Sequence, residues 1–316
     1  MMKLSLIVPC YNEEDNILPF YNEVSKTFKD QKIKVELIFI NDGSKDNTIK
    51  ELKKLTTNND FEIKIIDFSR NFGKEAGMYA GMEHSTGDYV SIIDVDLQQP
   101  PKIVLDMLEI LEKDEDYDAV AAYQVKRKDP FLKKHLSNMF YKVINKVADV
   151  EFKSGASDFR LLRKKVVDSI LEVKEYYRFS KGIFSWVGFR TYYMEYTPLE
   201  RANGSSKWSI KKLFKYAFDG ILSYTTFPIK IATIIGSILS LLSFIYLIIT
   251  IIQKLVFGID VPGYASLLGV SLFMGGIQLL FLGIIGEYIA RIYIETKNRP
   301  IYIARNIITN EKVKKD

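Results

Sequence analysis

Over the first hundred residues, short apolar runs alternate with longer segments in which apolar residues recur at helical spacing. Such runs are typical of buried strands, and each one here ends in polar, turn-forming residues. This pattern predicts strands over 4–9, 35–40, 63–68 and 89–93, and helices that reach about Phe28, run through Leu55 and cover 74–85. Strands that alternate with helices predict an α/β fold with a mostly parallel, doubly wound sheet.

Two much longer apolar segments lie near the C-terminus. Neither Ile231–Ile252 nor Val261–Gly286 contains a charged residue. A membrane-spanning helix needs roughly 20 apolar residues, so both are expected to cross a bilayer. The alternative is a pair of buried core helices, which rarely run so long without charge. Residues 209–226 combine lysines with apolar residues at helical spacing, which predicts an interfacial helix. Residues 131–147 read either as a second interfacial helix or as an ordinary amphipathic helix.

The charges around these spans predict an orientation. The connection from Gln253 to Asp260 carries only one lysine and one aspartate, whereas both flanks are richer in positive charge. Because positive flanks stay in the cytosol, both ends and the N-terminal domain are expected on the cytoplasmic side of a multi-pass inner-membrane protein. The predicted organisation is a domain over 1–208, a juxtamembrane amphipathic helix over 209–227, a two-helix anchor over 228–290 and a cytoplasmic tail over 291–316.

Composition narrows the chemistry. The net charge of +5 is too small to indicate nucleic acid as a partner without a clustered basic patch. One cysteine excludes a disulfide framework, and two histidines leave acid–base and metal chemistry mainly to carboxylates.

The first apolar run is short, contains Pro9 and leads into Asn12–Asp15, so it reads as a strand rather than a cleaved signal. Neither the G-x-G-x-x-G nor the P-loop signature is present, which disfavours dinucleotide dehydrogenases and P-loop enzymes.

An acidic cluster, Asp94-Val95-Asp96-Leu97-Gln98, follows the fourth expected strand. Residues two apart on an extended strand point the same way, so the two carboxylates need a compensating cation. Oxygen ligands suit Mg²⁺ or Mn²⁺, and magnesium is usually held by one or two carboxylates together with substrate phosphates. Such an ion would neutralise a departing diphosphate. A D-x-D alone is often only a solvated turn, and it is the strand-end position that favours a site.

Several motifs in this order resemble the family 2 glycosyltransferases of the GT-A fold, and more narrowly the polyprenyl- and dolichyl-phosphate glycosyltransferases. They comprise Val8–Glu14, Asn41–Ser44, Arg70–Lys74, Gly87-Asp88, Asp94–Gln98, Ser157–Leu162, Glu200-Arg201 through Ser206–Trp208 and the paired apolar segments. The resemblance implies a GT-A, Rossmann-like domain and a metal-dependent enzyme. One departure is visible, since the family usually continues L-Q-D-P-P and position 99 is Gln.

The resemblance also implies roles for individual residues. Asp94 would contact the nucleotide or sugar and join Asp96 and Gln98 around Mg²⁺ or Mn²⁺, and Asp96 is also counted as catalytic. Asp158 would be the candidate base beside the reacting centre. The residues expected to face phosphates, the acceptor's in particular, are Arg201, Ser205 and Lys207, and Arg201 is also counted as catalytic. The residues expected to hold the nucleoside are Pro9, Tyr11, Glu13 and Asp42.

The function expected from these features is inverting transfer of a hexose from a nucleotide sugar, UDP-glucose in the first instance, to polyprenyl (undecaprenyl) phosphate. Two alternatives stay open: a non-catalytic nucleotide-sugar-binding membrane protein, and a processive polysaccharide synthase. The latter is expected to have more spans and a Q-x-x-R-W motif, which neither Trp186 nor Trp208 provides. Partners are the donor, the lipid acceptor, the bilayer and, given only two spans per chain, a second copy in a homo-oligomer.

Overall fold

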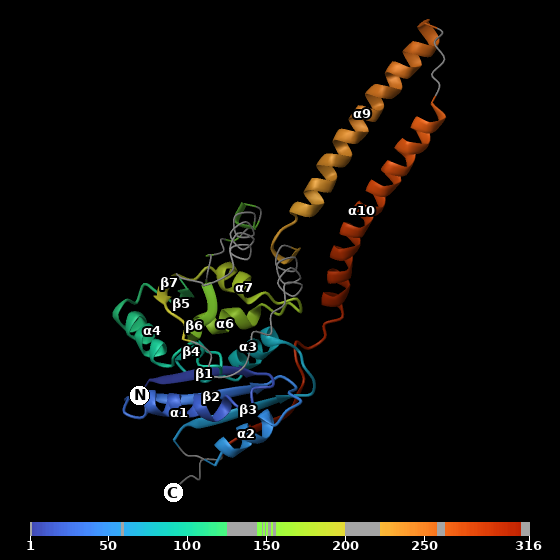
Figure 1. The fold of residues 1–316 in the computed structure, drawn as a ribbon. Coiled ribbons are helices and arrows are strands. Elements are labelled where there is room, and N and C mark those ends of the chain that lie inside the picture. The colour runs from blue at the N-terminus through green and yellow to red at the C-terminus, as the bar shows by residue number, and fades with distance from the viewer. Residues whose placement is uncertain are drawn as a thin grey trace. The chain divides into compact units, whose positions relative to one another are not determined.

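The computed structural model describes residues 2–57, 60–124, 144–146, 148, 150, 153, 156–199, 222–257 and 263–310. The chain forms two compact units (Figure 1). The first is built from most of the chain before residue 220 and from the segment after residue 298, and the second mainly from residues 221–298.

The described part of the first unit contains one sheet of eight strands in the order β7-β5-β6-β4-β1-β2-β3-β8. Its centre is parallel, because β4 pairs with β1, β1 with β2 and β2 with β3 in the same direction. β6 runs antiparallel to β4 and β5, and β8 runs antiparallel to β3. The strands are β1 (Lys3–Cys10), β2 (Lys34–Asn41), β3 (Glu62–Phe68), β4 (Tyr89–Ile92), β5 (Ala119–Gln124), β6 (Ala156–Arg163), β7 (Thr191–Tyr196) and β8 (Ala304–Thr309).

Helices cover both faces of this sheet, so the unit has three layers. Leu6 of β1 and Phe39 of β2 share one apolar cluster with the helices α1 (Ile17–Phe28), α2 (Thr48–Leu55) and α4 (Lys102–Lys113). The opposite face carries α3 (Lys74–Glu83), α6 (Lys164–Glu172) and the short α7 (Ser180–Trp186). Figure 1 shows α1 and α2 on one side of β1–β3 and α3 and α6 on the other. The expected α/β fold with a mostly parallel central sheet is therefore confirmed.

α3 lies unusually close to the sheet. A Cβ atom added at Gly81 would approach Ile7 Cγ2 to 2.2 Å, a distance that real side chains do not reach. A residue with a side chain at this position would push α3 away from β1, so glycine is needed for the close approach. α3 starts at Lys74. The close approach at Gly81 therefore also keeps the first turn of α3 near the ends of the strands.

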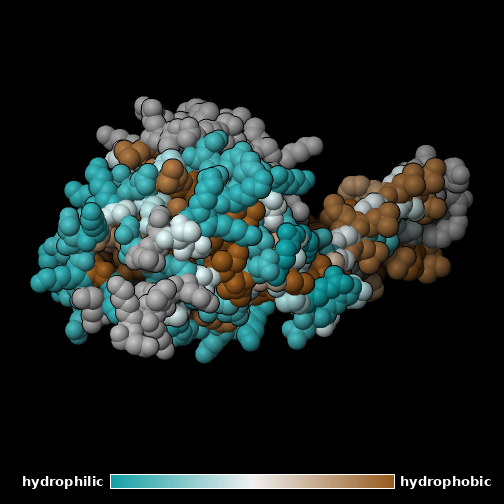
Figure 2. Space-filling view, turned by 90° about the horizontal axis from the view of Figure 1, so that it is seen from below, coloured by the Kyte–Doolittle hydropathy of each residue, from teal (hydrophilic) through white to brown (hydrophobic). Residues whose placement is uncertain are grey.

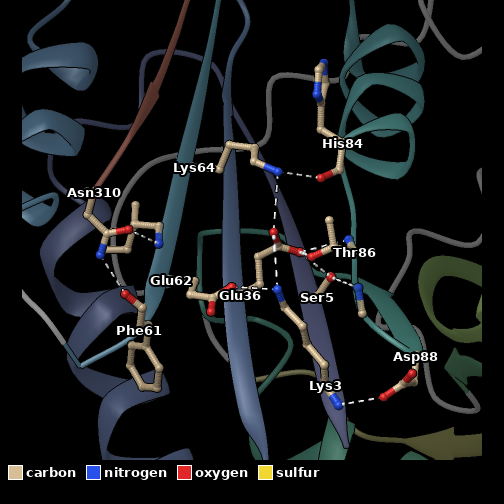
Figure 3. Close-up of polar contacts among 12 residues, drawn as sticks. Lys3, Ser5, Glu36, Phe61, Glu62, Lys64, His84, Thr86, Asp88 and Asn310 are labelled. Carbon is tan, nitrogen blue, oxygen red and sulfur yellow. Dashed lines mark hydrogen bonds and ion pairs between the residues drawn. The ribbon is translucent and has the colours of Figure 1, made fainter. Parts of the chain in front are cut away.

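The opposite ends of the strands carry a buried polar network centred on Glu36 (Figure 3). Its carboxylate accepts hydrogen bonds from Ser5 Oγ at 2.6 Å and from Thr86 N at 3.0 Å. Lys64 Nζ lies 3.4 Å from the same carboxylate. The carboxylate thus joins β1, β2 and β3 to the turn between α3 and β4. These partners lower the pKa of Glu36 although burial alone would raise it.

The second unit contains two long helices that contact each other, α9 (Phe227–Phe257) and α10 (Tyr264–Thr296) (Figure 1). Phe227–Gln253 and Leu267–Thr296 are long and apolar enough to cross a membrane, and none of their most apolar stretch is buried. The helices show a mostly hydrophobic surface in Figure 2, and the sheet unit a mostly hydrophilic one. Exposed apolar helices of this length are suited to lipid rather than to a soluble core.

Several sequence expectations concern segments that are only partly described. Nearly all of the expected interfacial helices over 131–147 and 209–227 lies outside the described residues. The expected tail over 291–316 includes the last residues of α10 and β8, which is the edge strand beside β3. The division at residue 208 and the homo-oligomer stay predictions.

Candidate active site

The ends of the first three strands are joined by hydrogen bonds between their loops. Asp42 N, just after β2, donates to Cys10 O at the end of β1, at 2.9 Å. Asn71 Nδ2, in the loop after β3, donates to Asp42 O at 3.1 Å. Burial, followed by the negative charges of Glu13, Asp94 and Asp46, raises the pKa of the Cys10 thiol. The polar strand ends therefore meet at one edge of the sheet, as a parallel topology requires.

Asp42, an expected nucleoside ligand, holds the loop between β3 and α3. Its carboxylate accepts the backbone N–H of Phe72 at 2.6 Å and that of Gly73 at 3.0 Å. Burial raises the pKa of Asp42 to about 6, and the two N–H groups and Arg70 only partly offset that effect. Its carboxyl group is thus a structural anchor of the site as well as a candidate contact for the donor.

Pro9, Tyr11 and Glu13 stand at the end of β1 and in the loop before α1, all half-buried. Asn12 in this loop has a φ of 52°, a conformation uncommon for residues other than glycine. Glu13 N donates to Thr48 Oγ1 at 2.9 Å, and Asn16 Nδ2 donates to Glu13 Oε2 at 2.6 Å. The loop is therefore fixed against the start of α2 before any ligand binds.

Lys74 joins the ends of β4 and β6. Its Nζ lies 2.6 Å from Asp94 Oδ1 and 3.6 Å from Asp158 Oδ2. Burial opposes the charge on Lys74, yet the two carboxylates raise its pKa. Burial likewise opposes ionisation of Asp158, but Lys74, Lys181 and Arg160 together lower its pKa. An ammonium group therefore stands between Asp94, the expected contact of the donor, and Asp158, the expected base.

Asp158 reaches this place because β6 runs antiparallel to β4. Ile92 at the end of β4 is in register with Arg160, so the start of β6 lies beside the end of β4. Asp158 Oδ1 is buried and has no hydrogen-bond partner in the part of the chain that the structure describes. Glu75, next to Lys74, accepts from Ser180 N at 3.0 Å and from Ser180 Oγ. Burial and the charge of Asp158 raise the pKa of Glu75.

The acidic cluster forms a tight turn after β4. Leu97 has a φ of 58°, which lies in the left-handed region. This conformation is unfavourable for a residue that has a side chain, and residues held in it often lie at functional sites. Asp96 Oδ1 accepts the backbone N–H of Gln98 at 3.2 Å, which closes the turn between these two expected metal ligands. Leu199 N donates to Gln98 O at 3.1 Å. The chain that leads to Arg201 thus leaves from beside the acidic cluster.

The acidic cluster offers oxygen ligands of the kind that a divalent cation takes. The described residues contain no group of three or more His, Cys, Asp or Glu side chains that could hold a metal. Asp94 and Asp96 supply two carboxylates and Gln98 an amide oxygen, which matches the sparse protein ligation of Mg²⁺ in sites completed by substrate phosphates and water. The residues therefore fit a cation that binds together with a diphosphate.

Not every expected site residue can be placed. The structure brings Asp94 and Asp158 together at Lys74 and joins the loop that carries Asp42 to the end of β1. Arg201, Ser205 and Lys207 lie outside the described residues. The sequence assigned no role to Lys74 or Gln99, yet both contact Asp94. A lysine directly after a strand-end loop was the signal for Lys74. No local pattern indicates that a glutamine five residues after an aspartate will turn back onto it.

Comparison with known proteins defines the class. The family model described as "Glycosyl transferase family 2" matches residues 5–171, and the model described as "GtrB C-terminal hairpin" matches residues 227–292. The chain belongs to glycosyltransferase family 2 and is a glycosyltransferase of the GT-A type with a membrane-associated helical hairpin.

Individual relatives cover nearly the whole chain. "Bactoprenol glucosyl transferase" of Shigella phage SfV is 42% identical over 96% of this chain and 99% of its own length. The glycosyltransferase sll0501 of Synechocystis sp. (strain PCC 6803), described as uncharacterized, is 41% identical over 97% of this chain and 96% of its own. Among solved structures, the mannosyltransferase PcManGT of Pyrobaculum calidifontis, in complex with GDP-Man and Mn²⁺, matches with a TM-score of 0.46 and 18% identity, covering 64% of this chain and 58% of that one.

Proposed function

We propose that this glycosyltransferase moves a hexose from a nucleotide sugar, UDP-glucose in the first instance, to polyprenyl phosphate at the cytoplasmic face of the membrane. The observation that carries the proposal is the position of Lys74 Nζ, 2.6 Å from Asp94 and 3.6 Å from Asp158. The ammonium group of Lys74 thus keeps Asp94, on the donor side, and Asp158, on the acceptor side, close to each other. The names of the bactoprenol relatives support the lipid acceptor and the glucosyl donor.

On the donor side, Asp94, Asp96 and Gln98 would hold Mg²⁺ or Mn²⁺. A bound cation there would neutralise the charge that develops on the departing diphosphate. The nucleoside would lie over Pro9, Tyr11, Glu13 and Asp42, whose loops are already fixed to one another by hydrogen bonds. A site organised before binding orients the donor with a smaller loss of conformational entropy.

On the acceptor side, Asp158 is ionised because its pKa is lowered by Lys74, Lys181 and Arg160. A carboxylate with a low pKa is a weak base. A phosphate monoester is itself largely anionic near neutral pH, since its second pKa is about 6, and needs little help in losing a proton. Asp158 therefore orients the acceptor. A phosphate oxygen forms the bond to the anomeric carbon, and the nucleoside diphosphate leaves from the opposite side with the bonding electron pair.

Positive side chains would guide the lipid phosphate to this point. Arg201, Ser205 and Lys207 follow Leu199 closely in the chain, and Leu199 N is hydrogen-bonded to Gln98 O at 3.1 Å. The short distance along the chain supports a role for these three residues at the edge of the donor site. Arginine and lysine suit a phosphate headgroup near a membrane because they pair with its charge.

The placement in the membrane rests on the connection of the two helices to the sheet. α9 follows the catalytic domain, and the chain after α10 returns to the same sheet as β8. If both helices span the bilayer, they must do so as a hairpin with both outer ends on one side. The positive flanks favour the cytosol for that side. This arrangement would leave the catalytic domain and both termini in the cytoplasm.

The test is a transfer assay with purified full-length protein in detergent, radiolabelled UDP-glucose, undecaprenyl phosphate and Mn²⁺ or Mg²⁺. We expect a labelled lipid product that disappears on chelation with EDTA and in the Asp96→Asn variant, while Asp106→Asn on the exposed face of α4 retains activity. Full activity of Asp96→Asn would contradict the assignment.

The same assay separates the alternatives. Donor binding without any product in the wild-type protein would favour a non-catalytic binding protein. A product that grows with time to many sugars per lipid would favour a polysaccharide synthase. A panel of UDP-glucose, UDP-GlcNAc, UDP-galactose and GDP-mannose identifies the donor.

A further inference from the structure

Gln99 is buried beside the acidic cluster, with only 7% of its surface exposed. Its side chain turns back onto Asp94 and makes two hydrogen bonds with it. Gln99 Oε1 accepts the backbone N–H of Asp94 at 2.9 Å, and Gln99 Nε2 donates to Asp94 Oδ2 at 3.2 Å. One amide group thus closes the turn from Asp94 to Gln99 and contacts both the backbone and the carboxylate of the same residue.

The two oxygens of Asp94 consequently have different partners. Oδ2 accepts from Gln99, whereas Oδ1 lies 2.6 Å from Lys74 Nζ. Rotation of the carboxylate about its Cβ–Cγ bond would break one contact or the other. The orientation that keeps both directs Oδ1 toward the positive charge at the centre of the site.

Only a neutral side chain with both a donor and an acceptor can make this pair of contacts. A carboxylate of the same length could still accept from Asp94 N, but it has no hydrogen to donate. It would also place a second negative charge about 3 Å from Asp94 Oδ2, at a buried position where repulsion is weakly screened. The amide at position 99, where the sequence departs from the family pattern, is therefore specifically matched to Asp94.

We propose that Gln99 is a positioning residue that orients the Asp94 carboxylate toward the cation and donor, a role that rests on the function proposed above. Gln99 is buried, and its side-chain hydrogen bonds go to Asp94. It acts through Asp94, by holding Oδ2 so that Oδ1 stays directed into the site. Loss of this restraint should weaken the binding of the cation and the nucleotide more than it slows the chemical step.

The experiment compares Gln99→Met, which keeps the volume but makes neither hydrogen bond, with Gln99→Glu, which keeps the acceptor for Asp94 N but loses the donor. Gln31→Glu, on the exposed turn after α1, is the control for added charge. Binding of Mn²⁺ alone is followed by electron paramagnetic resonance, and binding of UDP in the presence of Mn²⁺ by calorimetry. Steady-state assays supply kcat and the donor KM, and thermal unfolding supplies Tm.

We expect Gln99→Met, which loses both hydrogen bonds to Asp94, to weaken Mn²⁺ binding and UDP binding by about 5- to 10-fold each, a factor within the range that one net hydrogen bond contributes. Its donor KM should rise in proportion, with kcat within about 3-fold of wild type. Gln99→Glu should weaken UDP binding at least as much, because it lacks the donor and repels the diphosphate.

Two results would overturn the inference. Wild-type UDP affinity and KM in Gln99→Glu would show that the backbone contact alone matters. A fall in Tm and kcat of Gln99→Met with unchanged Mn²⁺ affinity would show that Gln99 only supports the fold. Failure of the wild-type protein to bind UDP or to transfer sugar would instead count against the proposed function, and the Mn²⁺ measurements would still decide the role of Gln99.

Discussion

Lys74 Nζ lies 2.6 Å from Asp94 Oδ1, so the first residue of α3 is paired with the carboxylate that follows β4. The same ammonium group lies 3.6 Å from Asp158 Oδ2 at the start of β6. The three residues come from separate parts of the chain, and the lysine is the only group among them that can offset two negative charges. This relationship determines how the site should respond to substitution and to cations.

Replacing Lys74 with Met should lower turnover strongly while tightening the binding of Mn²⁺. Without the ammonium group, Asp94 and Asp158 repel each other and lose their shared orientation. A divalent cation would then no longer compete with Lys74 for Asp94, so its affinity should rise by about 3- to 10-fold, as expected for about 1 kcal/mol of charge interaction at a partly exposed site. Transfer assays and Mn²⁺ titration measure the two effects.

Lys74→Arg keeps the charge and should keep more activity than Lys74→Met, although the planar guanidinium cannot reproduce the position of the ammonium group. Lys102→Met, at the exposed start of α4, removes a lysine away from these contacts and serves as the control. Unchanged or weaker Mn²⁺ binding in Lys74→Met would show that Lys74 does not compete with the cation for Asp94.

Gly43 lets the loop after β2 meet the loop after β3. It has a φ of 63°, and a Cβ atom there would lie 2.5 Å from the backbone of Arg70 and Asn71. Gly43→Ala should therefore destabilise the protein by about 1–3 kcal/mol and displace the loop held by Asp42, raising the donor KM. Gly188→Ala provides the control, because Gly188 has a φ of 75° but its nearest contact is 4.0 Å away. Equal donor KM values in the two variants would contradict the loop contact.

The Glu36 network predicts a pH-dependent contribution to stability. The pKa of Glu36 in the folded protein is lowered from 4.5, so the stabilisation is complete above about pH 5 and is lost as the pH falls through the folded pKa. Glu36→Gln should cost about 1–3 kcal/mol at pH 7, because the amide loses its charge interactions with Lys3 and Lys64. Thermal unfolding from pH 7 to pH 3 should show the difference from wild type shrinking, with Glu115→Gln as the exposed control. A difference that is constant with pH would argue for a packing effect.

Tyr302 ties the segment after α10 to the catalytic domain. Its hydroxyl donates to Glu83 Oε2 at 2.5 Å, its ring stacks on Phe68 with centroids 4.9 Å apart, and His84 Nε2 lies 3.0 Å from the hydroxyl. Tyr302→Ala should destabilise the pairing of β8 with β3 by about 2–4 kcal/mol, and Tyr302→Phe by about 1 kcal/mol. Hydrogen exchange of residues 304–309 measures this, with Tyr246→Phe on α9 as the control. Unchanged exchange in Tyr302→Ala would show that β8 holds its place without the tyrosine.

The sequence by itself determined the strands and helices of the first part of the chain and the acidic residues of the donor side of the site. Apolar periodicity set the strands and helices up to residue 93, because burial on one or both faces requires it. The acidic cluster and Asp42 were recognisable because strand-end loops in parallel sheets converge. The lengths of the two apolar helices were likewise readable from composition alone.

Tertiary structure decided the rest, because those contacts join residues that no local pattern links. The antiparallel course of β6 brings Asp158 to Asp94, and the return of the chain after α10 adds β8 to the sheet. Lys74 and Gln99 obtained their roles only from folding, through the two oxygens of Asp94. A periodic pattern records which face of an element is buried, but it does not record which distant side chain will lie against it.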